Sequence, residues 1–137
     1  MLFKSVAITI CILCLPVSVY ARNNSPITVT EMVFCADVKN RTPIGIKNNF
    51  SDSVERVFCF TKLSSTEDRT SISHVWYYND VQMAIVDLPV NARSWRTWSS
   101  KRIVREWTGV WRVDVISATG HIIFSEDFTV TPSSDNF

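Results

Sequence analysis

Glycine is scarce in this chain, which has only Gly45, Gly109 and Gly120 among its 137 residues. A phosphate-cradling loop needs several closely spaced glycines between a strand and a helix, and these three lie far apart. A nucleophile elbow needs the spacing Gly-x-Ser-x-Gly, which occurs nowhere in the sequence. The chain therefore lacks both motifs, and we interpret each glycine as a residue of a turn or of a strand start.

Histidine is equally scarce, with only His74 and His121, and neither forms an HxxxH spacing. A structural or catalytic zinc site needs three or four clustered histidine, cysteine or acidic ligands. The acidic residues are scattered, with no pair that the sequence places across a cleft for acid–base work. We therefore predict no catalytic residue, no metal and no cofactor, and an exported hydrolase is only the third hypothesis.

Neither sign of charge is in excess, because 14 Lys and Arg face 13 Asp and Glu, with two His, for a formal net charge of +1. Proteins that bind nucleic acid or anionic membrane surfaces through general electrostatics need a basic excess. The composition therefore predicts no nucleic-acid partner.

Long apolar runs are absent except near the N-terminus. Lys4 precedes the apolar stretch 6–15, and small residues up to Ala21 offer a cleavage site. This pattern is typical of a secretory signal peptide, and the stretch is short for a helix that spans a bilayer. We expect a signal peptide over 1–21 and one exported domain over 22–137, periplasmic or secreted and without a transmembrane segment. An uncleaved anchor is the alternative.

Cysteine is limited to four residues, two of which (Cys11 and Cys14) fall inside the predicted signal peptide. The remaining pair is Cys35 and Cys59. An even pair in an exported domain predicts one disulfide. The alternative is two separately buried thiols that behave as small apolar side chains.

Apolar and polar residues alternate throughout the chain, and this pattern predicts β-strands. Seven short strands with turn signals between them favour an all-β fold, an antiparallel immunoglobulin-like β-sandwich. A small closed β-barrel is the alternative. Residues 40–49 are interpreted as a turn-rich loop, and 101–107 is the one weak helical candidate. The predicted strands cover 27–38, 54–61, 71–78, 81–90, 94–101, 110–117 and 122–131.

Tryptophan is abundant, with five residues, and several lie beside basic residues or histidine. Indole faces stack on sugar rings, and arginine binds carboxylate or phosphate through a planar fork. If the third and sixth predicted strands are neighbours, His74, Arg112 and Arg96 could converge. The alternatives are a core histidine satisfied by its neighbours and a structural cross-strand ladder. The candidate binding residues are His74, Trp76, Arg96, Trp98, Lys101 and Arg112.

A series of short motifs runs along the chain in a characteristic order. They include Val57-Phe-Cys59-Phe-Thr61, Ile72-x-His74-x-Trp76-x-Tyr78, Trp95-Arg96-Thr97-Trp98 and Gly109-x-Trp111-Arg112-Val113. Together they resemble the domain of unknown function 2914 family over about residues 30–131. The resemblance implies a small β-rich domain, often attached to bacterial envelope proteins, with no established catalytic mechanism.

These observations favour an exported, non-catalytic binding or interaction module of the bacterial envelope, whose partner is a glycan or an envelope protein. The alternative is a structural envelope protein that pairs with its partner through the edge of a sheet.

Overall fold

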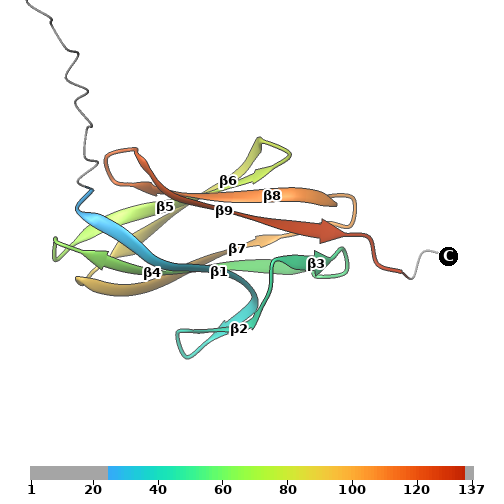
Figure 1. Cartoon of the computed structure of the whole chain (residues 1–137), viewed down its shortest axis with the longest axis horizontal. Helices are drawn as coiled ribbons and strands as arrows, with labels where there is room; N and C mark the ends of the chain where they lie inside the picture. Colours follow the sequence, from blue (N-terminus) through green and yellow to red (C-terminus); the bar gives the residue numbers. More distant parts are fainter. Residues whose placement is uncertain (1–24, 135–137) are drawn as a thin grey trace, which may run out of the picture.

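The computed structural model describes residues 25–134, which form two β-sheets packed face to face (Figure 1). Sheet A has the strand order β2-β1-β4-β7, and sheet B has the order β3-β9-β8-β5-β6. The sheets do not close into a barrel, so the predicted all-β sandwich is confirmed. The strands are β1 (Ile27–Lys39), β2 (Thr42–Ile46), β3 (Asn49–Ser51), β4 (Arg56–Ser65), β5 (Thr70–Tyr78), β6 (Val81–Val90), β7 (Ser94–Arg102), β8 (Gly109–Ser117) and β9 (Ile122–Thr131).

Two stretches of the chain differ from the prediction. The predicted loop 40–49 contains β2 and the start of β3, because Asn40 and Arg41 make a two-residue turn that folds β2 back along β1. Both turn residues have positive φ, 49° and 57°, as a tight hairpin turn of this kind requires. The predicted helix at 101–107 is wrong: this stretch ends β7 and turns into β8, and no helix occurs in residues 25–134.

All strand pairs are antiparallel except β3 and β9, which pair in parallel over three residues. Strand β5 lies between β8 and β6 in sheet B, so the third and sixth predicted strands are neighbours as expected. Among the strands of residues 25–134, β7 has β4 as its only hydrogen-bonded neighbour and forms one free edge of sheet A. This edge matters for the candidate site.

The core between the sheets is built around an aromatic cluster. Phe128 of β9 packs against Phe34 of β1, with ring centroids 4.6 Å apart, and against Trp111 of β8, at 5.9 Å. Phe50 of β3 and Trp76 of β5 meet the same ring edge-on. All five side chains are almost fully buried, so Phe128 joins sheet B to sheet A at the centre of the domain.

The predicted disulfide does not form in this structure, where Cys35 and Cys59 are both free and buried. In the ladder between β1 and β4, Phe34 lies opposite Cys59, whereas Cys35 lies opposite Phe58. The two cysteines are therefore one position out of register, and their side chains leave opposite faces of sheet A. Cys59 belongs to the core cluster between the sheets. Burial raises the pKa of both thiols, which keeps them protonated.

Thiol labelling tests whether Cys35 and Cys59 are free thiols. We expect an alkylating reagent to label two thiols of the purified domain 22–137 in denaturant without reductant, and to label neither in the folded protein. Intact mass spectrometry counts the labels. If the denatured chain stays unlabelled until reductant is added, the free-thiol arrangement is wrong.

The predicted signal peptide, residues 1–21, lies outside the described residues. Within residues 25–134, no helix is long and apolar enough to cross a membrane.

Candidate functional site

His74 and Trp76 lie in the interior between the two sheets, with no exposed surface. The Nδ1 atom of His74 is 2.7 Å from the Oγ of Ser99, and Nε2 is 3.4 Å from the Oγ1 of Thr61. The indole N–H of Trp76 donates to the same Ser99 hydroxyl at 3.0 Å. Burial lowers the pKa of His74 to about 4, so the ring is neutral at pH 7. This network joins β5 of sheet B to β4 and β7 of sheet A.

The close approach of Ser99 and His74 is not the geometry of a Ser-His-Asp triad. That mechanism needs an orienting carboxylate on the far ring nitrogen and a nucleophile that substrate can reach. Here Nε2 faces the hydroxyl of Thr61, and both His74 and Ser99 are buried. The polar contacts act as a hydrogen-bonded bridge within the core.

Arg112 lies on the outer face of sheet B, where its donors are already used. Its Nη1 donates to Asp80 at 2.5 Å and its Nε to Asp114 at 3.0 Å, while the guanidinium lies 4.4 Å from the ring centroid of Tyr77. Ser125 of the next strand also donates to Asp114. This arrangement is a structural cross-strand network.

Lys101 lies near the end of β7, where its ammonium group is 4.9 Å from the ring centroid of Trp107. Burial lowers the pKa of Lys101, and the charges of Arg56 and Arg102 lower it further. It lies five positions along the strand from Arg96, at the other end of the sheet.

The expected convergence of His74, Arg112 and Arg96 is not found. Although β5 and β8 are neighbours, His74 lies opposite Val115, whereas Arg112 lies opposite Tyr77. His74 and Arg112 are thus out of phase and point to opposite faces of sheet B. Arg96 belongs to β7 of sheet A and is exposed on the far side of the sandwich.

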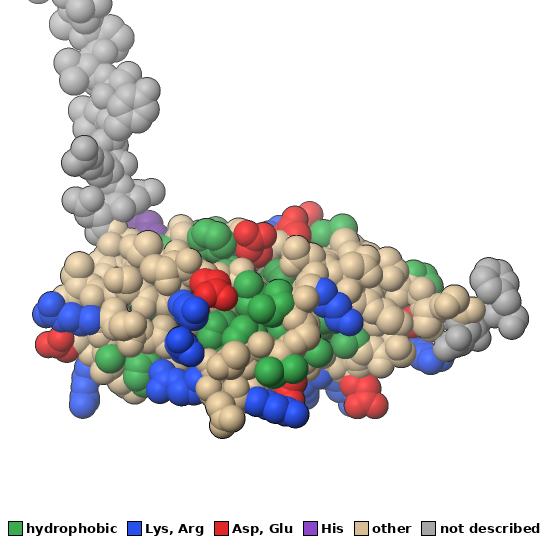
Figure 2. Space-filling model, turned by 60° about the horizontal axis from the view of Figure 1, so that its bottom comes forward, with side chains coloured by type: hydrophobic (Ala, Val, Ile, Leu, Met, Phe, Trp, Pro, Cys, Tyr) green, Lys and Arg blue, Asp and Glu red, His purple; other side chains and the backbone are tan. Residues whose placement is uncertain are grey.

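Arg96 and Trp98 do lie together, on the outer face of sheet A. Trp98 lies opposite Phe60, which lies opposite Val33, so these three side chains form an apolar row across β7, β4 and β1. The rings of Trp98 and Phe60 stack with an interplanar angle of 19° and centroids 6.3 Å apart. Trp98 is half-buried and its support Phe60 is fully buried. On the side of sheet A that Figure 2 brings forward, apolar side chains gather in the middle, with Lys and Arg side chains around them.

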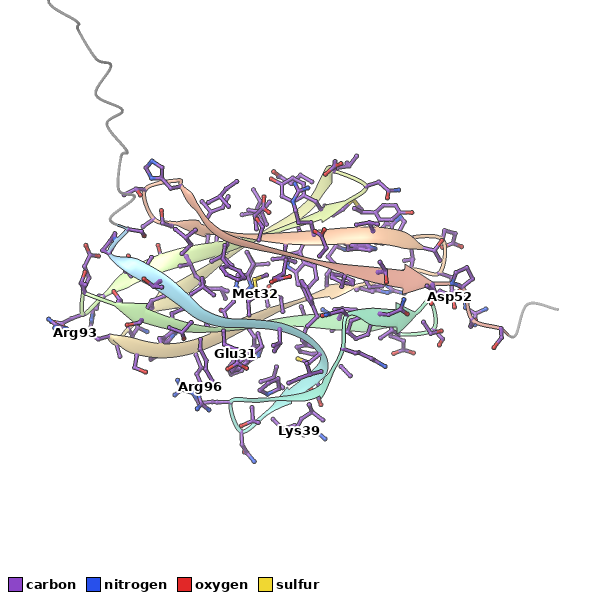
Figure 3. The ribbon with its side chains drawn as sticks, viewed as in Figure 1. Glu31, Met32, Lys39, Asp52, Arg93 and Arg96 are labelled. Atoms are coloured by element: carbon purple, nitrogen blue, oxygen red, sulfur yellow. The ribbon has the colours of Figure 1, made fainter. Side chains whose placement is uncertain are left out.

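A charged row runs beside the apolar one. In register, Arg96 lies opposite Lys62, and Lys62 lies opposite Glu31. The ammonium of Lys62 is paired with the carboxylate of Glu31 at 2.8 Å. Figure 3 shows Arg96 and Glu31 on the same side of sheet A, with Lys39 near the β1–β2 hairpin on that side.

A shallow groove of about 350 Å³ follows the free edge of β7, and we call it the β7 groove. Arg96 donates through Nη1 to the backbone oxygen of Arg41 at 3.2 Å, which ties β7 to the β1–β2 hairpin. The guanidinium of Arg41 lies 5.2 Å from the ring centroid of Trp95. None of the lining residues is acidic. They are Arg41, Pro89, Trp95, Arg96, Thr97 and Trp98.

A larger hollow of about 870 Å³ lies at the end of β4 and β7. Its lining includes three arginines, but also three acidic residues, so its fixed charges balance. The β7 groove instead combines two uncompensated cations with aromatic surface, and it is therefore the candidate site. The larger hollow is lined by Asp52, Ser53, Glu55, Arg56, Arg102, Ile103, Val104, Arg105 and Glu106.

Sequence reasoning missed Arg41, which it placed in a loop. Its φ of 57° belongs to the left-handed region, which few residues other than glycine adopt. The available signal was the two-residue spacing between Lys39 and Thr42, which suits a hairpin turn. That spacing indicates the turn but not the bonding partner of Arg41 in β7.

Comparison with known proteins agrees with the family resemblance. The model of the family described as Protein of unknown function (DUF2914) matches residues 69–130, which run from the start of β5 almost to the end of β9. The match includes Pro89, Arg96 and Trp98, whereas Arg41 and strands β1 to β4 lie outside it. No curated protein matches the chain. The motifs quoted before residue 69, such as Val57-Phe-Cys59-Phe-Thr61, lie outside the family match. The resemblance inferred from the sequence is thus confirmed over residues 69–130, where the chain matches the DUF2914 family.

Proposed function

We propose that the chain is an exported, non-catalytic binding module of the bacterial envelope that holds a glycan in the β7 groove. The observation that carries this proposal is the indole of Trp98, which is half-buried and held in place by the stacked ring of Phe60 on the neighbouring strand. A supported, partly exposed aromatic face binds a sugar ring with little loss of side-chain entropy, because the indole is already held in place.

The rest of the groove suits the same ligand. Arg96 is exposed and supplies N–H donors beside Trp98, and Trp95 adds a second partly exposed aromatic wall. The groove volume of about 350 Å³ lies within the range of small-molecule sites. Apolar surface with a few convergent donors is the usual composition of such a site.

A glycan array with peptidoglycan fragments and lipopolysaccharide cores tests the proposal with the domain 22–137. We expect Trp98→Ala and Arg96→Ala each to weaken binding about five- to thirtyfold, since each removes contacts worth about 1–2 kcal/mol. Arg102→Ala is the matched control, because Arg102 is exposed on the same strand and the same face of sheet A. If both groove variants bind as tightly as the wild type, the binding site lies elsewhere.

A second function is favoured by strand β6, the free edge of sheet B. It is ten residues long and exposes Val81 and Ile85, at 61% and 56% of their surface. An exposed edge of this length can take up a strand of a partner protein. Partner capture from envelope extract would then survive Trp98→Ala and be lost in Ile85→Lys. The glycan proposal instead expects that glycan binding is lost in Trp98→Ala and survives Ile85→Lys.

A further inference from the structure

We infer that the β7 groove recognises a saccharide ring that carries an anionic group, and this inference rests on the proposed function. Two guanidinium groups, from Arg41 and Arg96, line the groove, and no acidic residue lines it. A neutral sugar would leave both positive charges without a counter-charge. An arginine fork matches the geometry of a carboxylate or phosphate group.

The two groove arginines differ from others in the fold. Arg93 and Arg112 are each paired with an aspartate, Asp68 and Asp80 respectively. In residues 25–134, neither Arg41 nor Arg96 has a carboxylate within 4.0 Å.

The acid nearest in register does not neutralise Arg96. Glu31 occupies the same cross-strand row, but Lys62 lies between it and Arg96 and takes its carboxylate. The charge of Lys62 is thus compensated by Glu31, and the charge of Arg96 remains available to a ligand.

The positions of the two guanidiniums suit a ring rather than a free anion. Arg96 uses Nη1 on the backbone oxygen of Arg41, which orients its fork while its other N–H groups stay available. Arg41 is held beside the Trp95 ring, and the half-buried indole of Trp98, stacked on Phe60, lines the same groove. A uronic acid or a sugar phosphate carries an apolar ring face and an anionic group in one unit, and so matches both features.

The backbone at Arg41 provides an unusually clean variant. At a φ of 57° a β-carbon is strained, whereas glycine adopts this conformation without steric cost. Arg41→Gly therefore removes the guanidinium and, in the same substitution, relieves the backbone strain of the turn. We expect it to melt at or above the wild-type temperature while its affinity for an acidic saccharide falls.

Titration calorimetry of the domain 22–137 tests the inference with trigalacturonate and its primary amide, which differ in the charge of their carboxyl groups. We expect the amide to bind at least tenfold more weakly than the acid. Arg41→Gly should weaken binding of the acid about tenfold and change binding of the amide less than twofold. Arg96→Ala should weaken binding of the acid more than binding of the amide, because the amide loses only the neutral hydrogen bonds of Arg96. Arg102→Ala is the control for loss of an arginine outside the groove, and a phosphorylated oligosaccharide arm ranks phosphate against carboxylate.

The outcomes separate this inference from the proposed function. Equal affinity for acid and amide, with both lost in Trp98→Ala, would overturn the anionic preference and leave glycan binding intact. Failure of every neutral and acidic glycan to bind the folded wild type would overturn both. Loss of acid binding in Arg102→Ala as well would also overturn the inference, because general charge attraction would then explain the binding.

Discussion

Lowering the pH from 7 to 4 is expected to reduce the free energy of unfolding by about 3 kcal/mol through His74 alone. Burial lowers the pKa of this imidazole to about 4 in the folded chain, from an ordinary value of 6.5. Between these values the unfolded chain takes up a proton and the folded chain does not. Stability is therefore full above pH 6.5, falls as the pH drops below it, and levels off below pH 4.

Urea unfolding at several pH values between 4 and 7 measures this effect, with His74→Gln as the control. A glutamine amide can bond the hydroxyls of Ser99 and Thr61 but has no proton to gain. Wild type and variant share every other titrating group, so the difference between their pH profiles isolates His74. The groups within hydrogen-bond distance of the imidazole, Ser99 and Thr61, are uncharged. Parallel profiles would contradict the expectation.

Phe128→Ala is expected to cost about 3–5 kcal/mol of stability, the usual price for removing a fully buried aromatic ring. The ring packs against Phe34 of sheet A and against Phe50, Trp76 and Trp111 of sheet B. Its removal leaves a cavity between the sheets that these large, stacked rings cannot fill without losing contacts of their own.

Chemical denaturation of Phe128→Ala beside Phe124→Ala checks this prediction. Phe124 lies on the same strand β9, but 37% of its surface is exposed. Its substitution should cost about 1 kcal/mol or less, because less apolar surface returns to water. Equal losses in the two variants would show that the aromatic cluster is not the centre of the core.

Strands with one buried face could be predicted from the sequence. In β5 the inward residues Ile72, His74 and Trp76 alternate with the partly exposed Ser71, Ser73 and Tyr77, and the structure buries all three inward residues. Val75 is the exception, because it shares the outward face and is nevertheless buried. Strand β2 could not be predicted in this way, because four of its five residues are exposed and carry no alternation. It exists because of the two-residue turn before it and its pairing with β1.

The candidate site was predicted in part, for a related reason. Alternation places Arg96 and Trp98 on one face, and the structure agrees. Whether that face meets His74, Arg112 or Arg41 depends on which sheet each strand joins and how the β1–β2 hairpin lies, and these are long-range features. The disulfide prediction was wrong on the same ground, because a one-residue offset in the register of β1 and β4 separates the two cysteines.

The parallel pairing of β3 with β9 affects when the domain can fold during synthesis. Asn49 and Thr129, 80 positions apart, are hydrogen-bonded partners in this pairing, and β9 also supplies Phe128 to the core. A ribosome releases the chain from the N-terminal end, so the eight strands β1 to β8 leave it before β9, the strand that completes the sandwich. Until β9 emerges, the apolar faces of the two sheets cannot pack into a complete core. The nascent chain therefore remains unfolded and accessible to any factor that binds unfolded chains.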